Sequence, residues 1–239
     1  LDQKGYGLGM KVPVLVLTRA DGTSLYPLRD IAYALELTKK GTYIVVLGED
    51  QKLYNEQINA ALKELEIFQR KAVYYSFVLL QDGKMSTRKG NVVLLEDFMK
   101  EAMNKASGEL KKRYNKVDEK AAKVIAYGAI KYSILRVSPE KNVVFDWQQA
   151  LSFEGETAPY IQYAYARVSS ILKKHYETSK RFRSANLKLL KEREEIELIK
   201  LLSNFTEIIM KATNELRPHL IAVYLYSLAQ KFNEYYHIH

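Results

Sequence analysis

The 239-residue chain contains no cysteine, which excludes disulfides, thiol chemistry and zinc sites that use cysteine. It also lacks any run approaching about 18 uncharged apolar residues, so no membrane-spanning helix is expected. Its first residues show no basic-then-apolar leader, and we expect a cytoplasmic protein. Because 47% of the residues are apolar and 27% are charged, the composition argues against a disordered chain and against a coiled-coil rod. One large or two ordinary globular domains are expected.

The positive charge is concentrated in one part of the chain. The whole chain holds 37 basic and 28 acidic side chains, a formal net charge of +9. Residues 111–183 hold 15 basic and 7 acidic side chains, a net of +8, and the remainder is close to neutral. This concentration favours a polyanionic partner, and nucleic acid is preferred over a membrane because no strongly amphipathic basic helix stands out. A solvated charged face is the alternative interpretation.

The first 110 residues alternate between strand and helix patterns. Apolar runs at 12–17, 43–47 and 73–80 predict strands, and helical periodicity separates them. The first helix is expected to start after Thr23 or Ser24, either of which can serve as its N-cap. Strands joined by helices of this length indicate parallel β-α-β units.

Beyond residue 118 the strand pattern almost disappears. Helical periodicity covers residues 118–135, 157–176, 190–213 and 219–236. The sequence therefore predicts an α/β part followed by an all-α part, with a boundary near 140–155.

A glycine-bracketed segment at 82–91 carries three cations and a pair of hydroxyl groups directly after the third predicted strand. Flexible backbone, cations and hydroxyls suit a loop that closes on phosphate oxygens. A solvated basic turn is the alternative, and an unrelated nucleotidyl transferase would also fit a phosphate-clamping loop.

Five collinear segments resemble one enzyme family. Residues 84–90 (Lys-Met-Ser-Thr-Arg-Lys-Gly) look like the KMSKS loop of class I aminoacyl-tRNA synthetases, in the form seen in arginyl-tRNA synthetases. Residues 21–32, which include Asp-Gly-Thr at their start and Arg-Asp-Ile-Ala at their end, and 48–51 (Gly-Glu-Asp-Gln) are similar to further elements of the arginine enzymes. Residues 151–163 resemble the segment before their anticodon-binding helices, and short matches between 217 and 233 resemble their C-terminal pattern. The resemblance implies the second half of a Rossmann-type catalytic domain followed by a helical anticodon-binding bundle.

The resemblance assigns arginine recognition to Tyr26, Asp30 and Gln51. From the residues alone, Tyr26 and Asp30 are four positions apart on a predicted helix and therefore share a face. A carboxylate with a phenol suits a guanidinium, whose planar fork of donors pairs with an acid. The alternative is that Asp30 only favours the positive end of its own helix. Gln51 follows a strand end, where ligands of open α/β sheets gather.

The resemblance also implies that the chain acts on ATP, accompanied by Mg²⁺. The implied ATP-binding residues are Gly48, Asp50, Lys84, Met85 and Ser86, and the implied catalytic residues are Lys84, Ser86 and Arg88. The ammonium of Lys84 would stabilise charge on the phosphates as pyrophosphate leaves. Arg88 or Lys89 would supply the charge of the second lysine of the general motif, which is Thr87 here. No local run looks like a dedicated metal site.

The resemblance places tRNA contacts at Tyr160, Tyr163 and Arg167, beside the basic segment. Aromatic rings stack on splayed bases while cations hold phosphates. Half-buried packing is the alternative for any helical tyrosine. His237 and His239 near the end of the chain are expected to be incidental rather than metal ligands.

The chain also departs from the family pattern. The four histidines include no His-x-Gly-His motif, so we expect the C-terminal portion of a longer enzyme, inactive in isolation. Its expected parts are a partial catalytic domain at 1–110, a connecting segment at 111–150 and an anticodon-binding domain at 151–239. Tyr54 stands where the arginine enzymes often have histidine, and Ala158 replaces a usual glycine. Expected partners are tRNA(Arg), arginine and ATP, with a monomer favoured. The alternative function is a non-catalytic tRNA-binding module derived from a synthetase.

Overall fold

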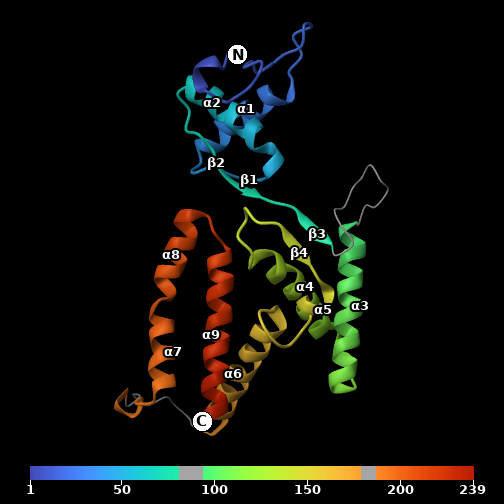
Figure 1. Ribbon diagram of the computed structural model, residues 1–239, viewed down its shortest axis with the longest axis vertical. Helices are drawn as coiled ribbons and strands as arrows, with labels where there is room; N and C mark the ends of the chain where they lie inside the picture. The colour runs from blue at the N-terminus through green and yellow to red at the C-terminus, as the bar shows by residue number, and fades with distance from the viewer. Residues whose placement is uncertain (81–93, 179–186) are drawn as a thin grey trace. The chain divides into compact units, whose positions relative to one another are not determined.

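The computed structural model describes residues 1–80, 94–178 and 187–239 (Figure 1). The chain divides into two compact units. Unit 1 comprises Leu1–Phe77 with Pro139–Lys141, and unit 2 comprises Val78–Ser138 with Asn142–His239. No helix among the described residues is long and apolar enough to cross a membrane. Each unit is described separately.

Unit 1 is built on one β-α-β arrangement. Its sheet pairs β1 (Ile44–Gly48) in parallel with β2 (Lys71–Tyr75), and its main helices are α1 (Tyr26–Thr38) and α2 (Lys52–Glu64). Short 3-10 turns, η1 (Lys4–Tyr6) and η2 (Glu49–Gln51), complete it. The core gathers apolar side chains of both helices and of the preceding extended segment: Leu15, Ile31, Ala34, Ile58, Ala61 and Leu62. The parallel connection expected from the sequence is confirmed.

Two local predictions in unit 1 are wrong. Residues 12–17 form no regular strand: the backbone N–H groups of Gln3 and Leu15 donate to the carbonyls of Pro13 and Leu1, and this pairing amounts only to an isolated bridge between Asp2 and Val14. The N-cap of α1 is Leu25, without a side-chain cap. The predicted caps close the preceding turn instead: Thr23 Oγ1 donates to Asp21 (2.6 Å), and Ser24 Oγ accepts from Arg29 Nε (3.0 Å).

The first part of unit 2 packs two helices against a small parallel sheet. The helices are α3 (Leu95–Tyr114) and α4 (Glu119–Leu135), and β3 (Val78–Leu80) pairs with β4 (Val143–Phe145) before the short α5 (Trp147–Ala150). The α3–α4 contact is made by fully buried alanines, Ala102, Ala106, Ala122, Ala126 and Ala129, which let the two backbones approach closely. The sequence predicts neither α3 nor β4, and the run at 73–80 is divided between β2 and β3, which lie in different sheets.

The remainder of unit 2 is helical. It comprises α6 (Ala158–Thr178), the 3-10 turn η4 (Leu187–Leu189), α7 (Arg193–Ser203), α8 (Phe205–Glu215) and α9 (His219–Ile238). Figure 1 shows α9 lying alongside α7 and α8, and α9 also packs on α6. The single helix predicted over 190–213 is two helices that meet at Asn204. The order of an α/β part and then an all-α part is confirmed.

Candidate functional site

Two of the three residues assigned to arginine recognition lie on α1, beside the start of α2. The rings of Tyr26 and Tyr54 are 5.8 Å apart between centroids, and the Tyr54 hydroxyl donates to Asp30 Oδ2 (3.3 Å). Burial, followed by the charge of Asp30, raises the pKa of the Tyr54 phenol, which keeps it protonated and able to donate. Tyr26 remains 69% exposed. The ring of Tyr26 and the carboxylate of Asp30 are therefore joined through Tyr54.

Asp30 also forms an ion pair that crosses unit 1. Arg70, in the connection between α2 and β2, places its Nη1 atom 2.8 Å from Asp30 Oδ2, and the side chains of Arg70 and Asp30 are only 3% and 11% exposed. Arg70 Nε donates to Asn55 Oδ1 (2.6 Å), and Asn55 Nδ2 donates to the Tyr74 hydroxyl (2.8 Å). Asp30 is not in the first turn of α1, which contains no acidic residue, so the helix-end interpretation is wrong. The carboxylate is held by a buried polar network.

The Gly-Glu-Asp-Gln segment forms the turn between β1 and α2. A Cβ atom at Gly48 would lie 2.5 Å from Asp50 Oδ1, so glycine makes room for this carboxylate. Gln51 Nε2 donates to Asp50 Oδ2 (3.1 Å) and the Gln51 side chain is exposed. The turn thus presents a carboxylate and an amide together at the carboxyl end of β1. No hydrogen bond among the described residues joins Gln51 to Tyr26 or Asp30.

The remaining residues assigned to ATP and catalysis, Lys84, Met85, Ser86 and Arg88, lie outside the described residues. Their assignment stays a prediction. Among the described residues there is no group of three or more histidine, aspartate or glutamate side chains that could hold a metal ion.

The residues assigned to tRNA binding lie on α6 in unit 2. The guanidinium of Arg167 lies between the rings of Tyr163 and Tyr236, at 4.7 and 4.4 Å from their centroids. It also donates to Asn233 Oδ1 (2.9 Å) and to the Tyr163 hydroxyl (3.1 Å), and thereby fastens α6 to α9. The ring of Tyr160 packs 5.6 Å from Tyr226. Tyr163 is exposed on one side, whereas Tyr160 and Arg167 are half-buried.

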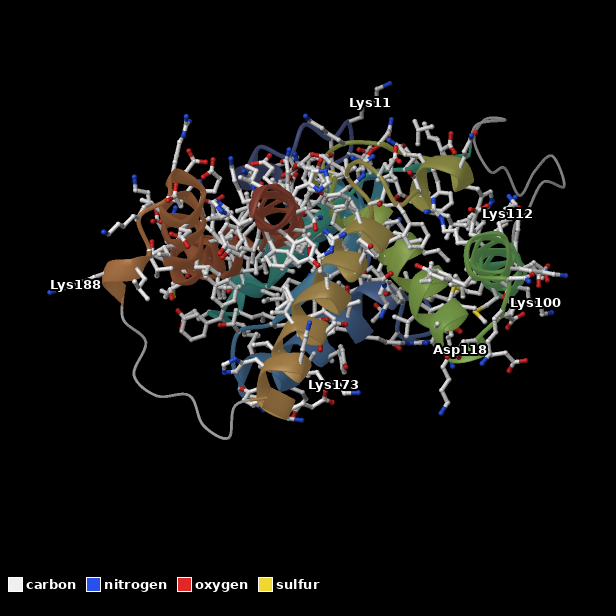
Figure 2. The ribbon with its side chains drawn as sticks, turned by 90° about the horizontal axis from the view of Figure 1, so that it is seen from below. Lys11, Lys100, Lys112, Asp118, Lys173 and Lys188 are labelled. Atoms are coloured by element: carbon white, nitrogen blue, oxygen red, sulfur yellow. The ribbon has the colours of Figure 1, made fainter. Side chains whose placement is uncertain are left out.

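Unit 2 also carries exposed cations on α3 and α6. Figure 2 shows Lys100 and Lys112 on α3, and Lys173 on α6, pointing away from their helices. A hollow of about 940 Å³ beside α3 and α5 is lined by three cations, by aromatic rings and by three carboxylates, of which Glu101 and Glu109 pair with lysines and the third is Asp146. Its lining includes Lys105, Lys112, Arg113, Phe145 and Trp147. Cations beside aromatic rings are the combination expected for a nucleic-acid surface.

Sequence reasoning missed the residues that hold Asp30. Asn55 and Asn59 occur four positions apart on α2, and Asn59 pairs with the backbone N–H (3.3 Å) and carbonyl (3.1 Å) of Arg70. The available signal was a pair of asparagines on the face of a helix that also carries the apolar core residues. Such a pair indicates a buried polar contact, since buried amides need partners. Nothing local indicated that Arg70 would reach back 40 residues to Asp30.

Two family models match the chain. The model described as "tRNA synthetases class I (R), catalytic domain" matches residues 1–147, and the model described as "DALR anticodon binding domain" matches residues 161–239. The arginine–tRNA ligase of Methanocella arvoryzae is 43% identical over 250 aligned residues, covering 100% of this chain and 42% of the relative. That of Methanocaldococcus jannaschii is 43% identical over 99% of this chain and 41% of its own length. The chain therefore spans about two fifths of the length of these curated relatives.

Solved structures of arginyl-tRNA synthetases are also similar to this chain. The arginyl-tRNA synthetase of Thermus thermophilus superposes with a TM-score of 0.79 at 30% identity, covering 95% of this chain and 44% of that one. The enzyme of Plasmodium falciparum superposes with a TM-score of 0.73 at 24% identity, over 96% of this chain and 40% of that one, and shows likeness of fold.

Proposed function

The chain belongs to the arginyl-tRNA synthetase family of class I aminoacyl-tRNA synthetases, and we propose that it acts, within its native polypeptide, in the ATP-dependent activation of arginine and its transfer to tRNA(Arg). The observation that supports this proposal most strongly is the carboxylate of Asp30, anchored on one oxygen and flanked by aromatic rings. A fixed carboxylate is the natural partner of a guanidinium group.

The proposed arginine site uses Tyr26, Asp30 and Gln51. Asp30 binds the substrate guanidinium, and the exposed face of Tyr26 packs on its plane. Gln51, at the carboxyl end of β1, lies where ligands of α/β sheets gather. It binds the end of arginine that carries the amino and carboxylate groups. Tyr54 supports Asp30 and is thereby assigned to this side of the site rather than to the nucleotide.

The proposed chemistry needs positioning and charge rather than a side-chain nucleophile. The arginine carboxylate attacks the α-phosphorus of ATP, an arginyl-adenylate forms and pyrophosphate leaves with its electron pair. Gly48 and Asp50 hold the nucleotide beside β1, and Met85 joins them. Lys84, Ser86 and Arg88 stabilise the charge that builds on the phosphate oxygens. Mg²⁺ bound to the triphosphate would neutralise part of its charge.

The proposed tRNA contacts belong to unit 2. Tyr163 offers an exposed ring for a base, Arg167 orients that ring, and Tyr160 supports the same helix from its half-buried position. The exposed lysines of α3 and the cations of the hollow beside α5 bind phosphates. We propose residues 1–110 as catalytic, 111–150 as connecting and 151–239 as anticodon-binding, in a cytoplasmic enzyme that works as a monomer.

The test is exchange of labelled pyrophosphate into ATP by the native polypeptide with tRNA present. The proposal predicts exchange that depends on arginine and is not supported by lysine or citrulline. Binding of tRNA without any arginine-dependent exchange would contradict it and would instead support a non-catalytic tRNA-binding module.

A further inference from the structure

The contacts of Asp30 are distributed unevenly over its two oxygens. The Tyr54 hydroxyl (3.3 Å) and Arg70 Nη1 (2.8 Å) both meet Oδ2. Oδ1 has no hydrogen-bond partner among the described residues, and it is not one of the buried polar atoms that lack a partner. One oxygen is thus fixed inside unit 1 while the other keeps its lone pairs for a ligand.

Arg70 is built into the fold and cannot swing aside for an incoming ligand. Its side chain is 3% exposed and its Nε atom donates to Asn55, which is itself 2% exposed. Asn59 holds the backbone N–H and carbonyl of Arg70 from α2. Because the guanidinium is anchored at both ends, a bound cation would share the Asp30 carboxylate with Arg70 rather than displace it.

We propose that Arg70 is a positioning residue for amino-acid recognition: it anchors Asp30 Oδ2 so that Oδ1 alone is presented to the substrate guanidinium. This inference rests on the proposed function, since it takes arginine as the ligand of Asp30. The internal guanidinium fixes the plane and the rotamer of the carboxylate before substrate arrives, which lowers the entropy lost on binding. A ligand with a planar fork of donors then meets a carboxylate of fixed orientation.

A purely structural role for Arg70 makes a different prediction. If Arg70 served only to stabilise unit 1, its replacement would reduce the fraction of folded enzyme and lower the apparent kcat. The KM for arginine is independent of the fraction of active enzyme, and so would not change. A positioning role acts on the arginine site alone and raises the KM for arginine while leaving the KM for ATP in place.

The experiment compares Arg70→Lys with wild type in the native polypeptide, by arginine-dependent pyrophosphate exchange with tRNA present. Lysine keeps the charge but loses the fork that joins Asn55 to Asp30. We expect the KM for arginine to rise at least about tenfold and the KM for ATP to stay within about twofold. Lys39→Met is the matched control, because it breaks the exposed Lys39–Glu36 pair at the C-terminal end of the helix that carries Asp30, and it should leave both constants unchanged.

A second variant covers the case in which Arg70→Lys does not fold. Asn55→Ala removes the acceptor of Arg70 Nε and should raise the KM for arginine about threefold through the loosened guanidinium. An unchanged KM for arginine in the folded variants, or an equal rise in both constants, would overturn the inference. A wild-type enzyme that shows no arginine-dependent exchange would overturn the proposed function instead, so that the two failures are distinguishable.

Discussion

The two units differ in one respect: unit 1 contains a buried ion pair, whereas the ion pairs described in unit 2 lie nearer the surface. Unit 1 buries the Asp30–Arg70 pair and surrounds it with Asn55, Asn59 and Tyr54. Unit 2 packs its interior with alanines and aromatic rings and keeps its ion pairs, such as Lys231–Glu197, near the surface, with side chains 40% and 32% exposed. A buried charge must be held rigidly by partners, whereas an exposed charge is already solvated. The difference suits the proposed roles, because a small cationic substrate needs a fixed carboxylate and a polyanion needs accessible cations.

The largest expected effect comes from breaking the buried pair. Asp30→Ala leaves the Arg70 guanidinium buried without a counter-charge, and we expect unit 1 to lose about 3–5 kcal/mol of stability. Hydrogen exchange of the α1 and α2 amides, followed by mass spectrometry, measures this loss locally. Glu36→Ala, at an exposed ion pair on the same helix, is the control and should change stability by less than about 0.5 kcal/mol. Equal effects of the two substitutions would contradict the contrast between the buried pair and the exposed pair.

A second effect tests the alanine packing of unit 2. Ala126 is fully buried at the α3–α4 contact. Ala126→Leu adds three carbon atoms to this contact and should cost about 1–3 kcal/mol by overpacking. Trp147, the one tryptophan of the chain, belongs to the same core and reports unfolding in urea by its fluorescence. Ala166→Leu, at an exposed position of α6, is the control. A neutral Ala126→Leu would show that α3 and α4 are less tightly packed than the structure indicates.

The aromatic surface of α6 gives a smaller effect. Tyr163→Leu removes an exposed ring that Arg167 orients, and we expect tRNA affinity to fall by about tenfold, which corresponds to about 1.4 kcal/mol. Binding titrations at a fixed salt concentration measure the loss. Tyr165→Leu, at another exposed tyrosine of α6, controls for general loss of aromatic surface. Unchanged affinity in Tyr163→Leu would leave Tyr163 and Arg167 with only a packing role.

The smallest effect concerns the surface ion pairs of unit 2. Hydrogen bonds from Lys231 and Arg193 lower the pKa of Glu197 from 4.5 to about 2. The contribution of this depressed carboxylate to stability is present above pH 4.5 and is lost as the pH falls toward about 2. In Glu197→Gln, the stability of unit 2 should therefore fall less steeply with decreasing pH over this range than it does in wild type. Glu207→Gln, at an exposed position of α8, should keep the wild-type pH profile, and a profile of Glu197→Gln identical to wild type would refute this assignment.

The sequence predicted what depends on local periodicity. The helices α1, α4, α6 and α9 follow apolar spacing, and Tyr26 and Asp30 share a face because they are four residues apart on one of them. Helix α3 was missed because its buried positions are alanines, such as Ala102 and Ala106, which contrast weakly with its polar residues. Strand β4 has only three residues, too few for a recognisable alternation.

Within the candidate site, the sequence predicts only the residues that belong to recognisable motifs. Asp30 was identified from its helix face and from the family resemblance, but its partner Arg70 is 40 residues away in sequence. Such a pair depends on how α1, α2 and β2 pack together, and no local pattern encodes that arrangement. The N-cap of α1 was mispredicted for a related reason, since the hydroxyls of Thr23 and Ser24 found partners in the turn before the helix.

We propose that Asp30, held on one oxygen, recognises a guanidinium with the other. The most direct test is calorimetric binding of arginine and of citrulline, its uncharged isostere, to the native polypeptide with tRNA present, in wild type and in Asp30→Asn. We predict that wild type prefers arginine by at least about 100-fold, because the charge-assisted pair is lost with citrulline, and that Asp30→Asn reduces this preference to within about threefold. The same preference in both proteins would show that Asp30 does not recognise the guanidinium.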